Sequence, residues 1–220
     1  METSNLGTGF KVTVKILGLC ASPRRGATEA VLRKALEAAK GFGCAIETEY
    51  VSLSNKRIAS CCDCRFCIEN QMWCQVKDDM QEIFDLIIDA DALLVASPVY
   101  VMSATPHLYA LCSRMRPAIH VYPELFREKF ISVIAVGGKR NGGQEITISN
   151  IHNLFMARGM NVVSNESGYY AGAHIWSKDG DAEAVLQDLS GIDSAEKLVR
   201  KLTEITYVHK LGRMASTLLA

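Results

Sequence analysis

An excess of charge of either sign is absent from this chain, because 24 Lys and Arg residues balance 24 Asp and Glu residues. No run of basic residues occurs either, which argues against nucleic acid or an acidic membrane surface as a partner. Every apolar stretch is too short or too charged to span a bilayer. The opening residues METSNLGTGF lack the basic and apolar regions of a signal peptide, so we expect a cytoplasmic protein.

Repeats, low-complexity segments and evident linkers are missing as well. The chain has 220 residues, of which 49% are hydrophobic, and this suits one α/β domain with a sizeable core. We therefore expect a disordered lead over residues 1–10 and a single domain over residues 11–220. The five histidines are scattered and follow no metal-ligand spacing.

Apolar runs of strand length alternate with helical patterns along the chain. The expected strands cover residues 11–19, 45–53, 91–96, 130–136 and 161–165. Thr28 is the expected N-cap of the first helix, and the last helical stretch, residues 181–209, should be interrupted near Ser190-Gly191. This alternation predicts an α/β fold, a doubly wound five-stranded parallel sheet with helices on both faces.

Five of the eight cysteines lie close together after the second expected strand. Cys61, Cys64, Cys67 and Cys74 have the spacing C-x2-C-x2-C-x6-C, and Cys62 is an extra thiol. The compact triplet with a nearby fourth cysteine is typical of [4Fe–4S] ligation, whereas structural zinc more often uses two separated knuckles. Zinc and inert or disulfide-bonded cysteines are the alternatives. We expect an inserted cluster loop over residues 59–77.

Three loops of unusual composition follow strand ends, where open parallel sheets bind ligands. The first, residues 22–28, offers backbone N–H groups, hydroxyls and an arginine to a phosphate, although it matches no dinucleotide or Walker A motif. The second, residues 97–103, offers Tyr100 for stacking on a ring. The third has four glycines within residues 137–143. A flat ring bearing one phosphate suits this set, and FMN is the redox cofactor of that description.

These stretches resemble the iron–sulfur flavoproteins, a branch of the NADPH-dependent FMN reductase superfamily with a flavodoxin-like fold. The matching segments are ASPRRGAT (21–28), the cysteine segment (61–80), SPVYVMSATP (97–106) and GGKRNGGQE (137–145). The resemblance implies FMN, one [4Fe–4S] cluster, a homodimer or homotetramer, and a ferredoxin-like electron donor.

The resemblance also implies a role for individual residues. Ser22, Arg24 and Thr28 would hold the phosphate, and the four cysteines Cys61, Cys64, Cys67 and Cys74 would hold the cluster, with Cys62 as the rival first ligand. The expected ring contacts are Pro98, Val99, Tyr100, Gly138, Asn141, Gly142 and Gly143. Two segments depart from the family pattern: Ala27 stands where Asn is usual, and Ser113-Arg114 stands where Asp-Arg is usual.

We therefore expect an oxidoreductase that passes electrons between a ferredoxin-like donor and an acceptor through the cluster and the flavin, with no acid–base catalytic residue. One rival is an NAD(P)H-dependent FMN or quinone reductase whose cysteines bind zinc or nothing. Another is a non-enzymatic, redox-sensing flavodoxin-like module.

Overall fold

A computed structural model of the chain describes residues 12–42, 45–178 and 182–219. Residues 1–10, expected as a disordered lead, lie outside the described residues. The strands are β1 (Thr13–Cys20), β2 (Ala45–Ser52), β3 (Ala92–Pro98), β4 (Phe130–Gly137), β5 (Asn161–Val162) and β6 (Ala173–Trp176). The α-helices are α1 (Ala27–Lys40), α2 (Phe66–Glu69), α3 (Met80–Asp89), α4 (Pro106–Arg114), α5 (Pro117–His120), α6 (Gln144–Met156) and α7 (Leu189–Leu219), with a 3-10 turn at Ala184–Gln187.

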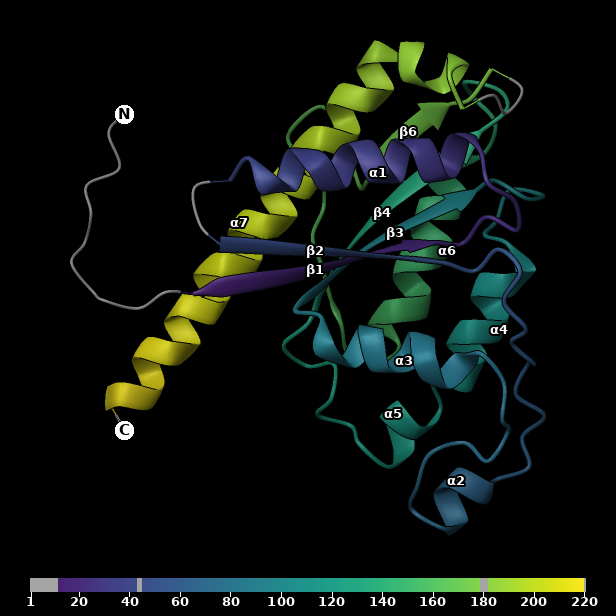
Figure 1. The fold of residues 1–220 in the computed structure, drawn as a ribbon, viewed down its shortest axis with the longest axis vertical. Coiled ribbons are helices and arrows are strands. Elements are labelled where there is room, and N and C mark those ends of the chain that lie inside the picture. Colours follow the sequence, from purple (N-terminus) through teal and green to yellow (C-terminus); the bar gives the residue numbers. More distant parts are fainter. Residues whose placement is uncertain (1–11, 43–44, 179–181, 220) are drawn as a thin grey trace.

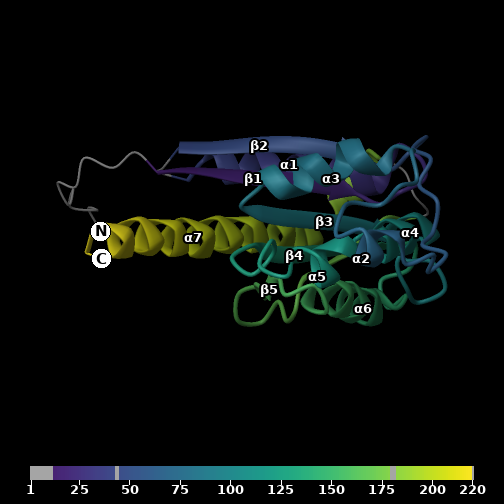
Figure 2. The same ribbon diagram turned by 90° about the horizontal axis from the view of Figure 1, so that it is seen from below.

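All strand pairs named for the sheet are parallel, in the order β2-β1-β3-β4-β5, with β6 also on β4. α1 and α7 cover one face, and α3, α4 and α6 cover the other (Figures 1 and 2). This is the doubly wound sheet expected from the alternation of strands and helices. The buried side chains form two hydrophobic clusters, one on each face of the sheet. Because both clusters pack against the same sheet, we propose that the chain forms a single domain.

The expectation of five strands is wrong in one respect, since the fifth position is shared by two short strands. β5 pairs with the start of β4 at Phe130 and Ile131, and β6 pairs with its end from Ile134 to Gly137. The buried side chain of Asn165 donates to the carbonyl of Gly172 at 3.3 Å and to that of Ser194 at 3.0 Å. This side chain therefore bridges the loop between the two strands to α7.

Two helix boundaries also differ from expectation. Gly26, not Thr28, is the N-cap of α1, because the helix begins at Ala27 and Thr28 lies inside its first turn. The expected interruption of the last helical stretch lies two residues before Ser190, at Asp188, between the 3-10 turn (Ala184–Gln187) and the start of α7 at Leu189. A Cβ on Gly191 would lie 2.4 Å from the Asp188 Oδ2 atom, so close packing, rather than a helix break, accounts for this glycine.

Candidate functional site

The first loop joins the end of β1 to the amino terminus of α1. Ser22 and Thr28 are both 4% exposed, and the Ser22 hydroxyl donates to the Arg24 carbonyl at 2.6 Å, which closes a tight turn. No described side chain caps the amino terminus of α1. Its first N–H groups and its positive dipole end are therefore available to an anion such as a phosphate.

The second loop leaves β3 at Pro98 and turns back on itself. Tyr100 and Ser103 exchange two backbone hydrogen bonds, of 2.8 and 2.9 Å. Val101 and Met102 at the tip have φ values of +49° and +59°, a left-handed conformation that is uncommon for such residues. Their strain is held by the paired backbone on either side, and Tyr100 remains 42% exposed.

These two loops line one cavity at the carboxyl ends of the parallel strands. Its lining residues are Ser22, Arg24, Gly26, Ala27, Thr28, Pro98, Tyr100, Val136 and Ser177. The cavity therefore brings together five residues expected to bind FMN. Three come from the first loop (residues 22–28, the phosphate loop) and two from the second loop (residues 97–103, the ring loop). Val99 lies beside them, with its N–H bonded to the carbonyl of Val136 at 2.9 Å.

The glycine-rich loop does not line this cavity but touches the ring loop. Gly143 has a φ of +94°, and a Cβ there would lie 3.0 Å from Met102 Cγ. The buried Gln144 side chain accepts from the Gly142 N–H at 2.8 Å and donates to the Lys139 carbonyl at 2.7 Å, which holds the loop's shape. Gly138 is exposed, and no atom lies within 4 Å of where its Cβ would be.

Asn141 lies in a separate, neighbouring hollow. That hollow is also lined by Arg140, Tyr170, His174 and Trp176. The glycine loop is thus adjacent to the cavity through Gly143, and Asn141 lines the neighbouring hollow.

The cysteine segment follows β2 and lies beneath α4 and α5, with α2 inside it (Figure 1). Its five thiols are free. The Cys62 side chain forms a hydrogen bond with that of Cys64, and Cys74 acts electrostatically on Cys67. Within residues 12–42, 45–178 and 182–219, no three Cys, His, Asp or Glu side chains form a metal-binding group. Among these residues the five thiols therefore share one loop without converging as a group of three.

The environment of these thiols differs from one to the next. The N–H of Phe66 is the main cause that lowers the pKa of Cys64 below its ordinary value, and Gln75 and Cys62 lower it further. Burial is the main cause that raises the pKa of Cys67. Cys61 is anchored through its backbone, because its N–H donates to the Ser113 hydroxyl at 3.0 Å.

Both ends of the cysteine segment are tied together by Arg114. Its guanidinium contacts Asp78 at 2.8 Å, and the two side chains are only 2% and 11% exposed. It also donates to the carbonyls of Ala59 and Val76, each at 3.1 Å. Burial opposes the charge of Asp78, but Arg114 and two backbone N–H groups keep the pKa of Asp78 below its ordinary value.

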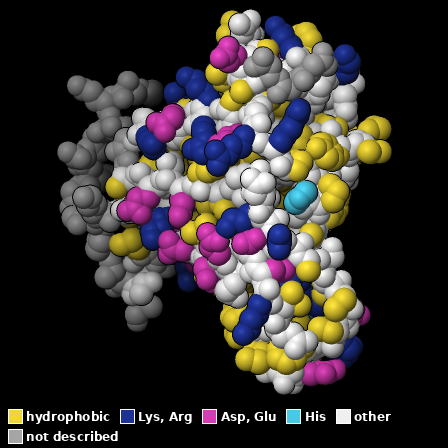
Figure 3. Space-filling view, turned by 45° about the vertical axis from the view of Figure 1, so that its right-hand side comes forward, with side chains coloured by type: hydrophobic (Ala, Val, Ile, Leu, Met, Phe, Trp, Pro, Cys, Tyr) yellow, Lys and Arg dark blue, Asp and Glu magenta, His cyan; other side chains and the backbone are white. Residues whose placement is uncertain are grey.

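Ser113 and Arg114 are therefore site residues that the sequence motifs did not identify. The available signal was their place in the sequence, Ser113-Arg114, where the family pattern has Asp-Arg. Trp73 fixes the same segment by packing, since it stacks on Tyr122 at 4.5 Å and meets the edge of Phe84 at 4.9 Å. In Figure 3, hydrophobic side chains gather on the lower lobe, where Figure 1 places α2.

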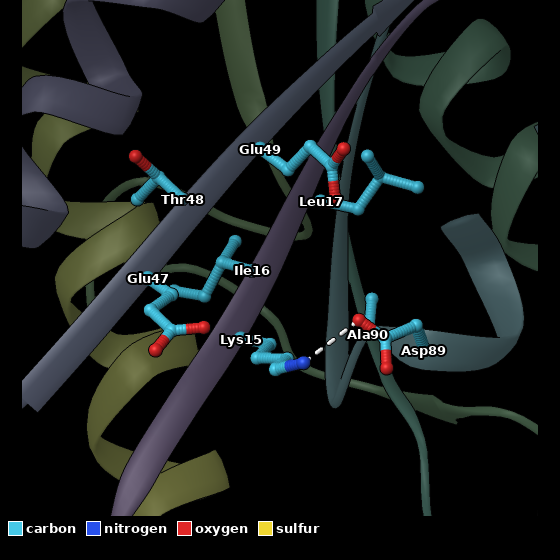
Figure 4. A pocket seen from close by; sticks show the side chains of 8 residues that line it. All are labelled: Lys15, Ile16, Leu17, Glu47, Thr48, Glu49, Asp89 and Ala90. Atoms are coloured by element: carbon cyan, nitrogen blue, oxygen red, sulfur yellow. Dashed lines mark hydrogen bonds and ion pairs between the residues drawn. The ribbon is translucent and has the colours of Figure 1, made fainter.

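Another hollow lies away from these loops, beside the strand residues Lys15 to Leu17 of β1. Lys15 forms an ion pair with Asp89 at 2.9 Å. Figure 4 shows this pair, with Glu47 and Glu49 on the neighbouring strand. It is at the amino-terminal half of the strands, opposite the edge at which parallel sheets bind cofactors. We assign it no role.

The residues present suit the two groups that the sequence implies. The uncapped helix end, two hydroxyls and Arg24 suit a phosphate, and the exposed face of Tyr100 suits a flat ring. Free thiols on one loop are the donors that iron–sulfur clusters use. In addition, the Nε atoms of Arg114 and Arg116 beside this loop are buried and unpartnered. They are available to an acceptor that the described protein atoms do not supply.

A sheet of order 2-1-3-4-5 with a cavity across the ends of β1 and β3 defines a flavodoxin-like protein. Similar solved structures agree on the fold. A flavone reductase superposes with a TM-score of 0.65 at 20% identity, covering 88% of this chain and 63% of its own. A WrbA-like flavodoxin from Agrobacterium tumefaciens gives 0.61 at 10% identity, covering 90% and 99%.

The family is defined by closer relatives. The NADPH-dependent FMN reductase model matches residues 14–174. An iron–sulfur flavoprotein of Methanocaldococcus jannaschii is 36% identical over 193 residues, covering 87% of this chain and 96% of its own. One from Archaeoglobus fulgidus is 36% identical over 191 residues, covering 86% and 96%.

The chain belongs to the iron–sulfur flavoproteins of the NADPH-dependent FMN reductase family. It is therefore an oxidoreductase of the flavoprotein class. Among the helices of the described residues, none combines the length and hydropathy that crossing a bilayer requires.

Proposed function

We propose that the chain binds FMN and one [4Fe–4S] cluster and passes electrons between a ferredoxin-like donor and an acceptor. When bound, FMN supplies one- or two-electron chemistry and the cluster supplies single electrons, so together they connect the two kinds of transfer. The protein's part is to bind both groups, orient them and set their surroundings.

The observation that carries this proposal is the shared cavity of the first two loops. Ser22, Arg24 and Thr28, together with the amino terminus of α1, would hold the phosphate. The ring would lie against a second set of residues from the other two loops: Pro98, Val99, Tyr100, Gly138, Asn141, Gly142 and Gly143. Pro98 restricts the backbone here, which keeps the neighbouring Tyr100 in place.

The cluster would be held by Cys61, Cys64, Cys67 and Cys74. α4 connects this loop to the cavity, because it begins at Pro106, just after the ring loop, and ends at Arg114, which donates to the Ala59 carbonyl of the cysteine segment. Nine helical residues span about 13 Å at 1.5 Å each. The helix is therefore the rigid element that sets the separation of the two sites within one chain.

Quantifying the cofactors of anaerobically purified protein tests the proposal. We expect one FMN and about four irons, with matching sulfide, per chain. Thr28→Val should lower FMN content and leave iron unchanged, whereas Cys67→Ser should lower iron and leave FMN bound. A purified chain without flavin, or with far less iron than this, would refute the proposal.

An NAD(P)H-dependent reductase that works without a cluster is the second candidate. It is favoured by the family model, named for NADPH-dependent FMN reduction, and by structural neighbours named flavone reductase and azoreductase. Steady-state turnover with NAD(P)H that survives replacement of all five loop cysteines by serine would select it. Loss of turnover in that variant, with FMN still bound, would select the cluster-dependent transfer.

A further inference from the structure

Two arginines at the carboxyl end of α4 face the cysteine segment. Arg114 is the last residue of the helix, and its side chain is 2% exposed. Arg116 follows in the turn before α5, is 28% exposed, and pairs with Asp63 at 2.5 Å. Asp63 lies within the cysteine segment and Asp78 lies at its end. Each guanidinium is therefore held by a carboxylate of the segment that it faces.

Each guanidinium also acts on a thiol that we assign to the cluster. Arg114 interacts with the Cys74 side chain, and Arg116 acts electrostatically on Cys67. Cys67 and Cys74 in turn influence one another. The two cations therefore act on two sulfurs of the same loop.

The ion pairs do not use all the donors of these guanidinium groups. Among the described residues, the Nε atoms of Arg114 and Arg116 are inaccessible to solvent and have no acceptor. A buried donor without a partner destabilises the folded protein. Two such donors of the same type beside one loop are available to an acceptor that binds there.

We propose that Arg114 and Arg116 are positioning residues for the iron–sulfur cluster, donating hydrogen bonds to its sulfur atoms and offsetting the negative charge of its thiolate ligands. This rests on the proposed function. Thiolate sulfur accepts N–H hydrogen bonds, and such bonds together with nearby charge are among the factors that set cluster potentials.

The charge balance around the loop gives the direction of the effect. Asp78 pairs with Arg114, and Asp63 pairs with Arg116. A cluster with four thiolates adds negative charge beside these pairs, and the two guanidinium groups partly offset it. One-electron reduction adds a further negative charge, which a neighbouring cation stabilises. Removing either guanidinium should therefore make the cluster harder to reduce and shift its midpoint potential to a more negative value.

The test uses full-length, anaerobically purified holoprotein and follows the cluster in mediated redox titrations by EPR, with iron and FMN quantified. We expect Arg116→Gln to keep its iron and shift the midpoint potential to a more negative value. Arg114→Lys, which keeps the charge but loses the guanidinium donors, should retain FMN while its iron content falls. Arg65→Gln is the matched control, since Arg65 is a 61% exposed arginine of the same loop and should leave both values unchanged.

Unchanged potential in Arg116→Gln together with full iron content and unchanged potential in Arg114→Lys would overturn the inference. An equal shift in Arg65→Gln would overturn it too, because any loop charge would then act alike. If the unsubstituted protein binds no iron, the proposed function fails instead. The two failures are therefore distinguishable.

Discussion

Buried polar side chains in this protein differ in how fully they are compensated. The Arg114–Asp78 pair is satisfied on most sides, whereas His152 on α6 is 5% exposed and its Nε2 atom has no partner among the described residues. Burial disfavours the charged imidazole and lowers the pKa of His152 to about 4. A group of this kind makes stability depend on pH.

We expect the free energy of unfolding to fall as the pH is lowered from 6.5 to 4. Above pH 6.5 both states hold a neutral His152. Within the window the unfolded state binds a proton that the folded state refuses, so unfolding is favoured by up to about 3 kcal/mol. Urea titrations across this range measure the slope. His152→Leu should flatten it, while a matching slope loss in His120→Gln, at an exposed position, would contradict the assignment.

α4 is the element on which both candidate sites depend. Its N-cap, Thr105, is fully buried, accepts from the Leu108 N–H at 3.4 Å and donates to the Ala21 carbonyl at 2.7 Å. The first bond starts the helix and the second ties it to the phosphate loop. At the other end, Arg114 and Ser113 hold the cysteine segment.

Thr105→Ala should lower the free energy of unfolding by about 2 kcal/mol, because it removes the cap and leaves the Ala21 carbonyl unpaired. FMN affinity should fall as well, since the phosphate loop loses its anchor. Chemical denaturation and flavin titration measure the two effects. Thr105→Ser keeps both hydrogen bonds and is the control. Wild-type stability in the alanine variant would show that the cap contributes nothing.

The whole chain is organised around one sheet, but α7 extends beyond it. Its 31 residues cross the face covered by α1, and its carboxyl-terminal turns project past the strands (Figures 1 and 2). Two ion pairs join α7 to the rest of the chain: Lys210 pairs with Asp91 at 2.6 Å, and Arg213 pairs with Glu128 at 3.0 Å. On the outer side Val208 is 60% exposed.

We propose that this outer side of α7 contacts another copy of the chain in a homodimer or homotetramer. The solution mass should then be at least twice 24.1 kDa. Val208→Asp should reduce it toward 24.1 kDa, because a charge replaces apolar surface. Light scattering after size exclusion measures the mass. Glu204→Gln, one turn earlier at an exposed position, is the control, and an unchanged mass in Val208→Asp would reject this surface.

Local patterns in the amino-acid sequence were sufficient to determine the fold class and the first four strands. Continuous apolar runs such as Leu93 to Ala96 are typical of strands buried on both faces of a parallel sheet, and helical stripes mark the connections. The cysteine spacing and the loop motifs likewise identified the family before any coordinate was needed. Motifs of this kind are local, so they do not depend on how distant segments pack.

Tertiary structure decided what depends on contacts between distant segments. β6 was not predicted, because four residues pair with β4 only when the turn before them is folded. The roles of Ser113 and Arg114 follow from segments more than 30 residues away in sequence, as does the meeting of the phosphate and ring loops in one cavity. Spacing determined which thiols belong to one loop, but packing against α4 determines how that loop is held.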